Sequence, residues 1–263
     1  MDYAVVSLVA LLAAALTFFS GFGLGTLLMP ALAFFMPLPV AVAATAVVHL
    51  ANNLFKVALV GRHASRDVLI RFALPAILAA FAGAWLLELF ASRTLPLTTW
   101  TLGARTFEIT LLKLVIALIM LGFAVLELWP GFSKWSIDAR WLPLGGVISG
   151  FFGGLSGHQG ALRSAFLARS GLSKESFIGT GVVAAVAVDL ARLFVYVVAM
   201  RASSLGDITR QGHWGLVAAA SAAALAGSLL GARLIEKVTL RGVRLIVGLM
   251  LAAIGLALGA GLI

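Results

Sequence analysis

A long apolar region of the chain is interrupted by the stretch Gly153-Gly154-Leu155-Ser156-Gly157-His158-Gln159-Gly160. Glycine is disfavoured inside helices, because its backbone loses more conformational freedom on folding than that of any other residue. The apolar segments on either side, 141–153 and 160–169, are too short to cross a bilayer singly, since about 13 helical residues rise about 20 Å against a hydrocarbon core of about 30 Å. The sequence therefore predicts two half-helices joined by a glycine-rich turn.

The N-terminal part of the chain has the same plan. Apolar segments 5–20 and 25–36 flank the run Gly21-Phe22-Gly23-Leu24-Gly25, and a proline-containing junction and a long apolar helix follow. This region is therefore expected to hold a second pair of half-helices.

The spacing of the two regions indicates an internal duplication. The interval from Gly25 to Thr45 equals the interval from Gly160 to Thr180, and both intervals contain a glycine-broken apolar segment, a short junction and the start of a long helix. We infer one transmembrane domain with no soluble domain, built from a first repeat at 1–135 and a second repeat at 136–263.

The composition places these segments in a membrane. Hydrophobic residues make up 62% of the chain and charged residues only 11%, about half the charged fraction of a typical soluble domain. Apolar stretches of about 18–20 residues are long enough to span the hydrocarbon core as helices. The stretches that reach this length are 38–60, 68–91, 111–129, 176–200, 213–235 and 245–262. We therefore expect an all-α polytopic membrane protein.

Charge and residue usage exclude several other kinds of protein. The net charge is +9, but Lys and Arg are dispersed singly, without the basic patch of a nucleic-acid-binding protein. The chain has no cysteine, which excludes disulfides and thiolate chemistry, and its four histidines lack the spacing of metal ligands. We expect no cofactor, no metal and no nucleic-acid partner, and we interpret the apolar N-terminus as retained structure rather than a signal peptide.

The distribution of Lys and Arg indicates how the half-helices are arranged. Single crossings would divide these residues almost equally between the two sides, whereas hairpins gather most of them on one side, in accord with the positive-inside rule. Each repeat then consists of a broken-helix hairpin plus three transmembrane helices, and the second repeat is inverted in the membrane. We expect a multi-pass protein of the plasma (inner) membrane with both termini periplasmic or exterior. The loops 92–110 and 201–212 are expected on the same side as the termini, and the loops 61–67, 130–140 and 236–243 in the cytoplasm.

The first glycine-rich region resembles the sulfite exporter TauE/SafE family. The residues that carry the resemblance are Gly21-Phe22-Gly23-Leu24-Gly25-Thr26-Leu27-Leu28-Met29-Pro30, Leu38-Pro39 and Ala43-Ala44-Thr45, echoed in the second half by Gly150 to Gly160 and by Gly179-Thr180. The second turn departs from the family pattern, because Gly157 to Arg163 is polar and cationic and Ala165 stands where Pro30 has its counterpart. The resemblance implies transport of sulfite, sulfonates or related sulfur-containing anions.

Arg163 is the foremost candidate for binding such an anion. A charge at the centre of a transmembrane helix costs about 2.5–3.5 kcal/mol on insertion scales, so a residue of this kind is a functional candidate. Arg163 lies in the first turn of the half-helix 160–169, where the helix dipole opposes a cation and favours an anion. We expect it to hold substrate together with the turn residues Ser156, Gly157, His158, Gln159 and Gly160. The alternative is a structural bridge between Arg163 and Asp189.

A polar stripe lies on the predicted helix 40–60. His49, Asn52, Asn53 and Lys56 are spaced i, i+3, i+4 and i+7, with Thr45 one turn earlier, so they share one face. We expect Asn52 and Asn53 to line the permeation path and His49 to titrate, unless the amides only form hydrogen bonds between helices. Lys56 is expected to extend to the cytoplasmic surface.

Two further sets of residues complete the candidate site. The glycine-rich turns of both repeats are expected to meet near the membrane midplane around the anion, which adds Gly23, Gly25 and Thr26. Asp189 and Arg192 lie three residues apart on the predicted helix 176–200. In this pair Asp189 serves as a proton-coupling acid or Arg192 as a second anion ligand, or else the two residues neutralise each other.

These features favour a secondary transporter of a small anion that works by alternating access, and not an enzyme. The stretch Gly154-Leu155-Ser156-Gly157 also matches the Gly-x-Ser-Gly of rhomboid-type intramembrane serine proteases, with Ser156 as nucleophile, but no histidine lies in 214–263 to serve it from a later helix. The expected partners are the small anionic substrate, a coupling proton or ion and the lipid bilayer, and the sequence leaves a homo-oligomer open.

Overall fold

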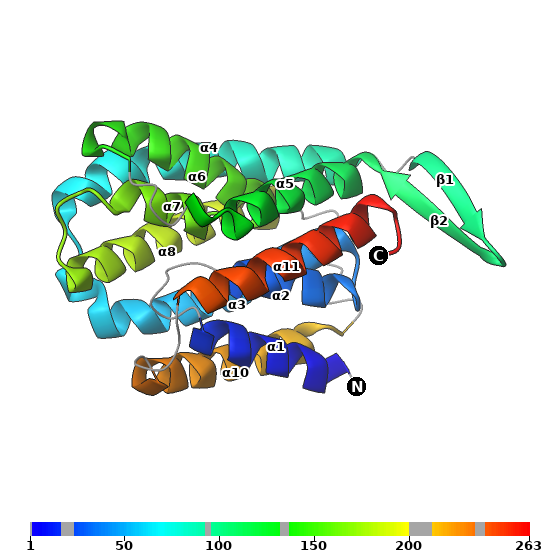
Figure 1. The fold of residues 1–263 in the computed structure, drawn as a ribbon, viewed down its shortest axis with the longest axis horizontal. Coiled ribbons are helices and arrows are strands. Elements are labelled where there is room, and N and C mark those ends of the chain that lie inside the picture. The colour runs from blue at the N-terminus through cyan, green and yellow to red at the C-terminus, as the bar shows by residue number, and fades with distance from the viewer. Residues whose placement is uncertain (1, 17–23, 93–95, 132–136, 200–211, 235–239) are drawn as a thin grey trace.

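The computed structural model describes residues 2–16, 24–92, 96–131, 137–199, 212–234 and 240–263. These residues form a bundle of helices, from one end of which a two-stranded β-hairpin projects (Figure 1). The prediction of an all-α membrane protein is confirmed for the bundle, and the hairpin is an addition to it.

Ten α-helices are described, and each follows an apolar run of the sequence. In chain order they are α1 (Asp2–Leu16), α2 (Leu24–Ala33), α3 (Leu38–Val60), α4 (Arg66–Ala91), α5 (Leu111–Leu128), α6 (Leu142–Ser156), α7 (Gly160–Leu167), α8 (Lys174–Ala199), α10 (Trp214–Leu234) and α11 (Leu240–Gly259). Prolines near the first residues of α3 and α6 fit these helix starts, because proline at the first turn leaves no backbone bond unmade.

Five of the described helices are long and apolar enough to cross a bilayer: α3 with the 3₁₀ turn Gly61–His63 after it, α4, α5, α8 and α10. Large apolar side chains such as Leu78, Trp85 and Val125 lie on the outer surface of the bundle, where their exposed fractions are 72%, 62% and 65%. An exposed apolar surface of this kind is unfavourable in water and favourable against lipid. The chain is therefore a multi-pass membrane protein.

The short helices α6 and α7 run back along each other. Gly157 ends α6 with φ +81°, a left-handed conformation that glycine adopts without strain. The amide N of Ile137, just before α6, donates to the carbonyl O of Ala165 at the far end of α7 across 3.4 Å. A Cβ added to Gly145 in the first turn of α6 would meet the ring of Phe166. The turn thus reverses the chain, and neither helix crosses the bundle alone.

The helix α6 packs directly on the backbone of α4. Gly146, Gly150 and Gly154 lie one turn apart, and a Cβ at any of them would collide with the backbone of Phe72, Ala76 or Ala80, respectively. Small residues at this spacing let two membrane helices approach closely.

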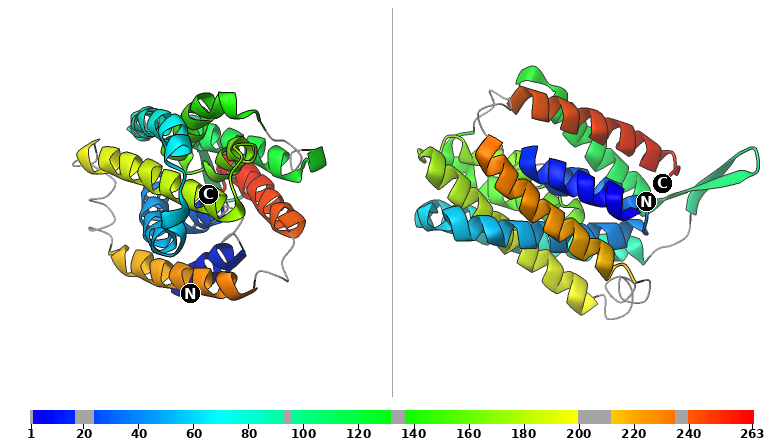
Figure 2. Two further views of the ribbon diagram at one scale, coloured as in Figure 1. Left: turned by 90° about the vertical axis from the view of Figure 1, so that its left-hand side faces the viewer. Right: turned by 90° about the horizontal axis from the view of Figure 1, so that it is seen from below.

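The helices of the two sequence halves pack against each other reciprocally. α4 packs on α6 and α1 packs on α10, while α3 packs on α8 and α5 on α11. Gly227 of α10 faces the backbone of Leu11 in α1, as the glycines of α6 face α4. Figure 2 shows these pairs from two further directions.

The segment 92–110, which the sequence analysis treats as a loop, contains strands β1 (Pro96–Leu102) and β2 (Arg105–Thr110). They pair in antiparallel register from Pro96↔Thr110 to Leu102↔Arg105 across a two-residue turn that begins with Gly103 at φ +61°. Trp100 stacks on Phe107 with ring centroids 4.7 Å apart, and its indole nitrogen donates to the carbonyl of Ala260 across 2.7 Å. The hairpin thereby contacts the C-terminal end of the chain.

Both termini lie at the same end of the bundle as the β-hairpin (Figure 1). The connection between α3 and α4 lies at the opposite end. The expected grouping of the termini with the segment 92–110 agrees with this arrangement.

Candidate functional site

The carboxylate of Asp189 is the centre of a buried polar network. Arg192 donates to Oδ1 through Nε at 3.1 Å and Nη2 at 2.7 Å. Gln159 donates to the same oxygen through Nε2 at 3.3 Å. On the other oxygen, Oδ2, His49 Nδ1 lies at 2.6 Å and Asn53 Nδ2 at 3.3 Å. An ionised carboxylate only accepts hydrogen bonds, so Nδ1 of His49 carries the proton in this contact. The network joins α3, the turn between α6 and α7, and α8.

The packing of α3 on α8 produces this network. Asp189 and Arg192 are one turn apart on α8, and neither side chain is exposed. Opposite them, the polar stripe of α3 faces inward as expected, since Thr45, His49, Asn52, Asn53 and Lys56 are all buried. The expectation for Lys56 is wrong, because this side chain is only 5% exposed and does not extend to the surface.

Arg163 lies at the edge of the same network and is 4% exposed. Its Nη1 donates to Oε1 of Gln159 across 3.1 Å, and Gln159 in turn donates to Asp189. Arg163 is therefore linked to the carboxylate through an amide, while Arg192 and His49 contact the carboxylate themselves. Lys56, one turn along α3 from Asn53, is also buried in the bundle. We call His49, Asn53, Lys56, Gln159, Arg163, Asp189 and Arg192 the central polar cluster.

The central polar cluster has more positive than negative groups. In their usual charged forms Lys56, Arg163 and Arg192 contribute three positive charges, and Asp189 contributes the one negative charge among these residues. All four side chains are buried. Cationic side chains therefore outnumber the carboxylate in this cluster, which suits it to an anion.

The turn between α6 and α7 presents a histidine with one unused nitrogen. His158 Nδ1 lies 3.0 Å from Ser156 Oγ and 3.1 Å from the Ser156 carbonyl, and its ring stacks on Phe123 with centroids 5.4 Å apart. Among the described residues, His158 Nε2 is buried without a hydrogen-bond partner. Leaving a buried polar group unsatisfied costs about 1–3 kcal/mol, so this nitrogen is suited to contact a ligand.

A second unused nitrogen belongs to Asn52. Its Oδ1 accepts a hydrogen bond from Ser228 Oγ across 2.6 Å, while Nδ2 has no partner within the part of the chain that the structure describes. An amide N–H can only donate, which suits an oxyanion. Ser228, in the Ala-rich helix α10, does not appear among the residues predicted from sequence, because a single serine there carries no recognisable pattern.

The glycine-rich segments of the two halves meet at this site. A Cβ added to Gly25 would lie 3.5 Å from the carbonyl O of Gly157 and 3.6 Å from Cδ2 of His49. Thr26, Gly25 and Gly160 are buried. The remaining predicted residue of this group, Gly23, lies outside the described residues.

Several hydrogen bonds that the sequence does not reveal hold the turn in place. Ser149 Oγ donates to the Gln159 carbonyl across 2.9 Å, and Tyr196 Oη donates to the Gly154 carbonyl across 2.7 Å. They tie both ends of the turn to α6 and α8. Preorganised polar groups of this kind are what a binding site requires.

The hydroxyl of Ser156 is buried and donates to the carbonyl of Phe152 across 3.1 Å. Its proton is engaged with the backbone four residues earlier, an interaction common for serine in membrane helices. In the described ranges, no group of three or more His, Cys, Asp or Glu residues is placed to bind a metal ion.

Comparison with known proteins adds one finding. The sequence model of the family described as sulfite exporter TauE/SafE matches residues 6–258, nearly the whole chain, which confirms the resemblance carried by the glycine-rich segments. Comparisons with curated proteins and with solved structures give no match.

Proposed function

We propose, from the premise that the chain belongs to the sulfite exporter TauE/SafE family, that it carries sulfite, a sulfonate or another small sulfur-containing anion by alternating access. The family is one of membrane anion exporters, so transport across a bilayer is the activity from which the proposal starts. The sulfur-containing substrate is inferred from the family, and the central polar cluster supports an anionic substrate.

The observation that carries the proposal is the number of cationic side chains buried in the central polar cluster. Ionisable side chains inside a membrane protein are costly to bury and are retained chiefly where they serve function. Arg163 and Lys56 lie in this cluster in addition to the Asp189–Arg192 pair. A small oxyanion is attracted to such a cluster, whereas a cationic substrate is repelled by it.

We assign the anion contacts to Arg163, Asn52 and His158. A guanidinium offers two parallel N–H groups to an oxyanion, which makes Arg163 the main ligand. Asn52 Nδ2 and His158 Nε2 are two of the buried nitrogens that lack a partner among the described residues. Because Nδ1 of His158 faces two oxygens of Ser156, its Nε2 accepts a hydrogen bond when the ring is neutral and donates one when it is protonated. His158 therefore fits either a protonated or an ionised oxyanion.

We further propose that residues 1–135 and 136–263 are inverted repeats. The reciprocal packing of α4 on α6 and α1 on α10 supports this arrangement. So does the contact of Gly25 with Gly157, which joins the two glycine-rich segments. In inverted-repeat transporters the substrate binds where broken helices meet, and rocking of one half against the other exposes the site to each side in turn.

Asp189 and His49 are the groups we assign to coupling. Their 2.6 Å contact lets a proton on His49 be shared with the carboxylate, and Asp189 accepts a hydrogen bond from Gln159, which in turn accepts one from Arg163. Binding of a proton and of an anion would thereby influence each other through a short chain of hydrogen bonds.

The test is flux into liposomes that contain the purified full-length protein. Labelled sulfite, sulfate and a small sulfonate are each supplied with and without a pH gradient, with protein-free liposomes as control. We expect protein-dependent flux of at least one sulfur oxyanion and competition among those that bind. Folded protein that moves none of them faster than the control would overturn the proposal.

A further inference from the structure

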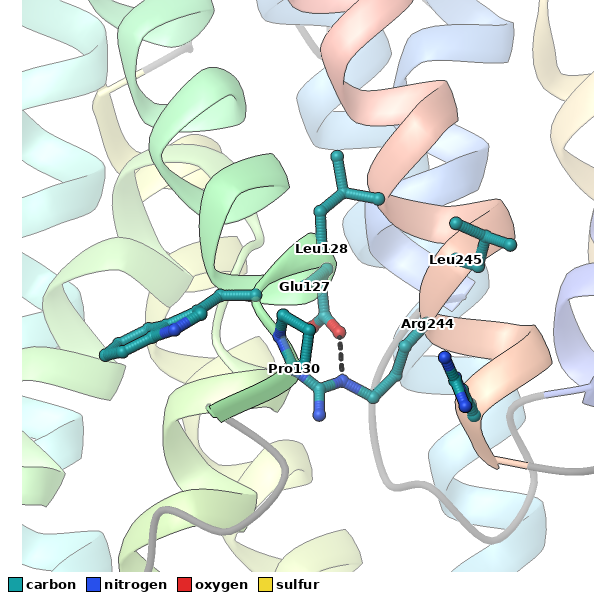
Figure 3. Close-up of a pocket in the computed structure, with 7 residues that line it drawn as sticks. Glu127, Leu128, Pro130, Arg244 and Leu245 are labelled. Atoms are coloured by element: carbon teal, nitrogen blue, oxygen red, sulfur yellow. Dashed lines mark hydrogen bonds and ion pairs between the residues drawn. The ribbon is translucent and has the colours of Figure 1, made fainter.

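A pocket with a volume of about 400 Å³ opens between the end of α5 and the start of α11 (Figure 3). Its lining residues are Glu127, Leu128, Trp129, Pro130, Arg241, Arg244 and Leu245. None of them belongs to the central polar cluster, and the transport proposal leaves the pocket without a role. Its size falls in the range of small-molecule sites.

One side of the pocket is a buried ion pair. Arg244 Nε lies 2.9 Å from Oε2 of Glu127, and Arg244 Nη2 donates to the carbonyl of Leu126 across 2.9 Å. Figure 3 shows the two side chains reaching toward each other from neighbouring helices. The pair fixes the guanidinium at the mouth of the pocket and is neutral as a whole.

Arg241 makes the pocket cationic. Its side chain is exposed, and it forms no ion pair with any residue that the structure describes. Arg241 and Arg244 both lie in the first turns of α11, which begins at Leu240. The dipole of a helix disfavours cations at its N-terminus and favours an anion there. Arg244 has Glu127 as its partner, so Arg241 is the arginine whose charge in this position a bound anion best accommodates.

The surroundings of the pocket identify the kind of anion. Trp129 follows the last residue of α5 and is about half exposed, as is typical of tryptophan at the membrane–water interface. Leu245, Ile246 and Leu249 extend from the pocket along α11 as exposed apolar side chains. A cationic and aromatic recess that continues into an apolar helix face matches a phosphate headgroup with acyl chains attached.

We propose that this pocket binds the phosphate headgroup of an anionic phospholipid, with Arg241 and Arg244 as ligands of the phosphate and the face of α11 against the acyl chains. The bound lipid joins α5 to α11, the final helices of the two sequence halves. This assignment does not depend on the identity of the transported anion.

The experiment is native mass spectrometry of the full-length protein in detergent, titrated with phosphatidylglycerol or with phosphatidylcholine. Arg66→Gln is the matched control, because Arg66 is also exposed at the start of a helix but does not line the pocket. We expect phosphatidylglycerol to bind more tightly than phosphatidylcholine. Arg241→Gln should weaken the tightest phosphatidylglycerol adduct about fivefold, and Arg66→Gln should leave it unchanged.

The contribution of Arg244 to lipid binding is measured with a double variant, because Arg244→Gln alone leaves Glu127 buried without its partner. Glu127→Gln with Arg244→Gln removes both charges and should weaken the same adduct further when combined with Arg241→Gln. Equal binding of the two lipids, or equal loss in Arg241→Gln and Arg66→Gln, overturns the proposal. Displacement of the lipid by inorganic phosphate at equal concentration also overturns it, since charge alone would then be recognised.

Discussion

Arg192 Nη2 lies 2.7 Å from Asp189 Oδ1, and both side chains are fully buried in the helix bundle. The two residues are one turn apart on α8, so the pair forms within a single helix. The other carboxylate oxygen of Asp189, Oδ2, has its partners on a different helix. His49 and Asn53 approach it from α3. The carboxylate thereby connects a self-neutralised pair to groups of the other sequence half.

Asp189→Asn should destabilise the protein by about 3–5 kcal/mol, because Arg192 is then buried without a carboxylate. The double change Asp189→Asn with Arg192→Gln should recover much of that loss. Thermal unfolding in detergent measures both. If Asp189 couples transport to protons together with His49, the folded double variant loses gradient-driven flux and retains substrate counterflow. Full gradient-driven flux in the double variant assigns the pair a structural role.

Arg163→Ala should raise the substrate concentration for half-maximal flux about ten- to a hundredfold, since a hydrogen bond to a charged group is worth about 1.5–3 kcal/mol. Arg163→Lys keeps the charge but loses the paired N–H groups, so it should lie between Arg163→Ala and the unchanged protein. Arg169→Ala, an exposed position beyond α7, is the control and should have no effect. Unchanged substrate binding by folded Arg163→Ala protein would refute the assignment.

Gly150→Ala should destabilise the protein by about 1–3 kcal/mol, because its Cβ collides with the backbone of Ala76 and pushes α6 away from α4. Gly122→Ala is the matched control. Nothing lies within 4 Å of a Cβ at that position of α5, so alanine there should be neutral or stabilise by up to about 1 kcal/mol. Thermal unfolding of the Gly150→Ala and Gly122→Ala variants measures the effect of the close α4–α6 contact. Equal unfolding midpoints for the two variants would contradict this contact.

Ser156→Ala should retain most transport, because the hydroxyl is engaged with the carbonyl of Phe152. Its loss removes one contact of His158 Nδ1 and leaves the contact of this nitrogen with the Ser156 carbonyl in place. Proteolytic activity that the unchanged protein shows and Ser156→Ala lacks would instead support the nucleophile alternative.

Cysteines introduced singly at Pro37 and Asp138 should react with a membrane-impermeant maleimide from opposite sides of the membrane. Both positions are exposed, and the chain has no cysteine of its own. A cysteine at Ala104, in the turn of the β-hairpin, should react from the same side as the one at Pro37. Reaction of the Pro37 and Asp138 variants from one side would exclude the hairpin arrangement of the half-helices.

The local elements follow from local sequence. The half-helices predicted at 141–153 and 160–169 correspond to α6 (Leu142–Ser156) and α7 (Gly160–Leu167), because the glycines between them weaken any continuous helix. The β-hairpin also has a recognisable pattern in its local sequence. Threonine-rich strands on either side of Gly103-Ala104 are typical of a two-residue hairpin turn with glycine first.

The expectation for Lys56 shows where local reasoning ends. Its place near the end of α3 suggests a side chain that reaches water, yet it is buried in the central polar cluster. Burial depends on which helices lie beside α3, and the 3.6-residue period gives only the direction of the side chain.

The sequence by itself determined the membrane-embedded helices, the break at 153–160, the family and, apart from Lys56, the residues of the central polar cluster, because hydropathy, glycine content and helical spacing are properties of neighbouring residues. Only the tertiary structure decided which of these residues contact each other. His49 meets Asp189 and Ser228 meets Asn52 across 140 and 176 positions of the chain. Such contacts arise because α3 packs between α8 and α10, and the close fit of small residues that sets helix packing is shared among helices far apart in sequence.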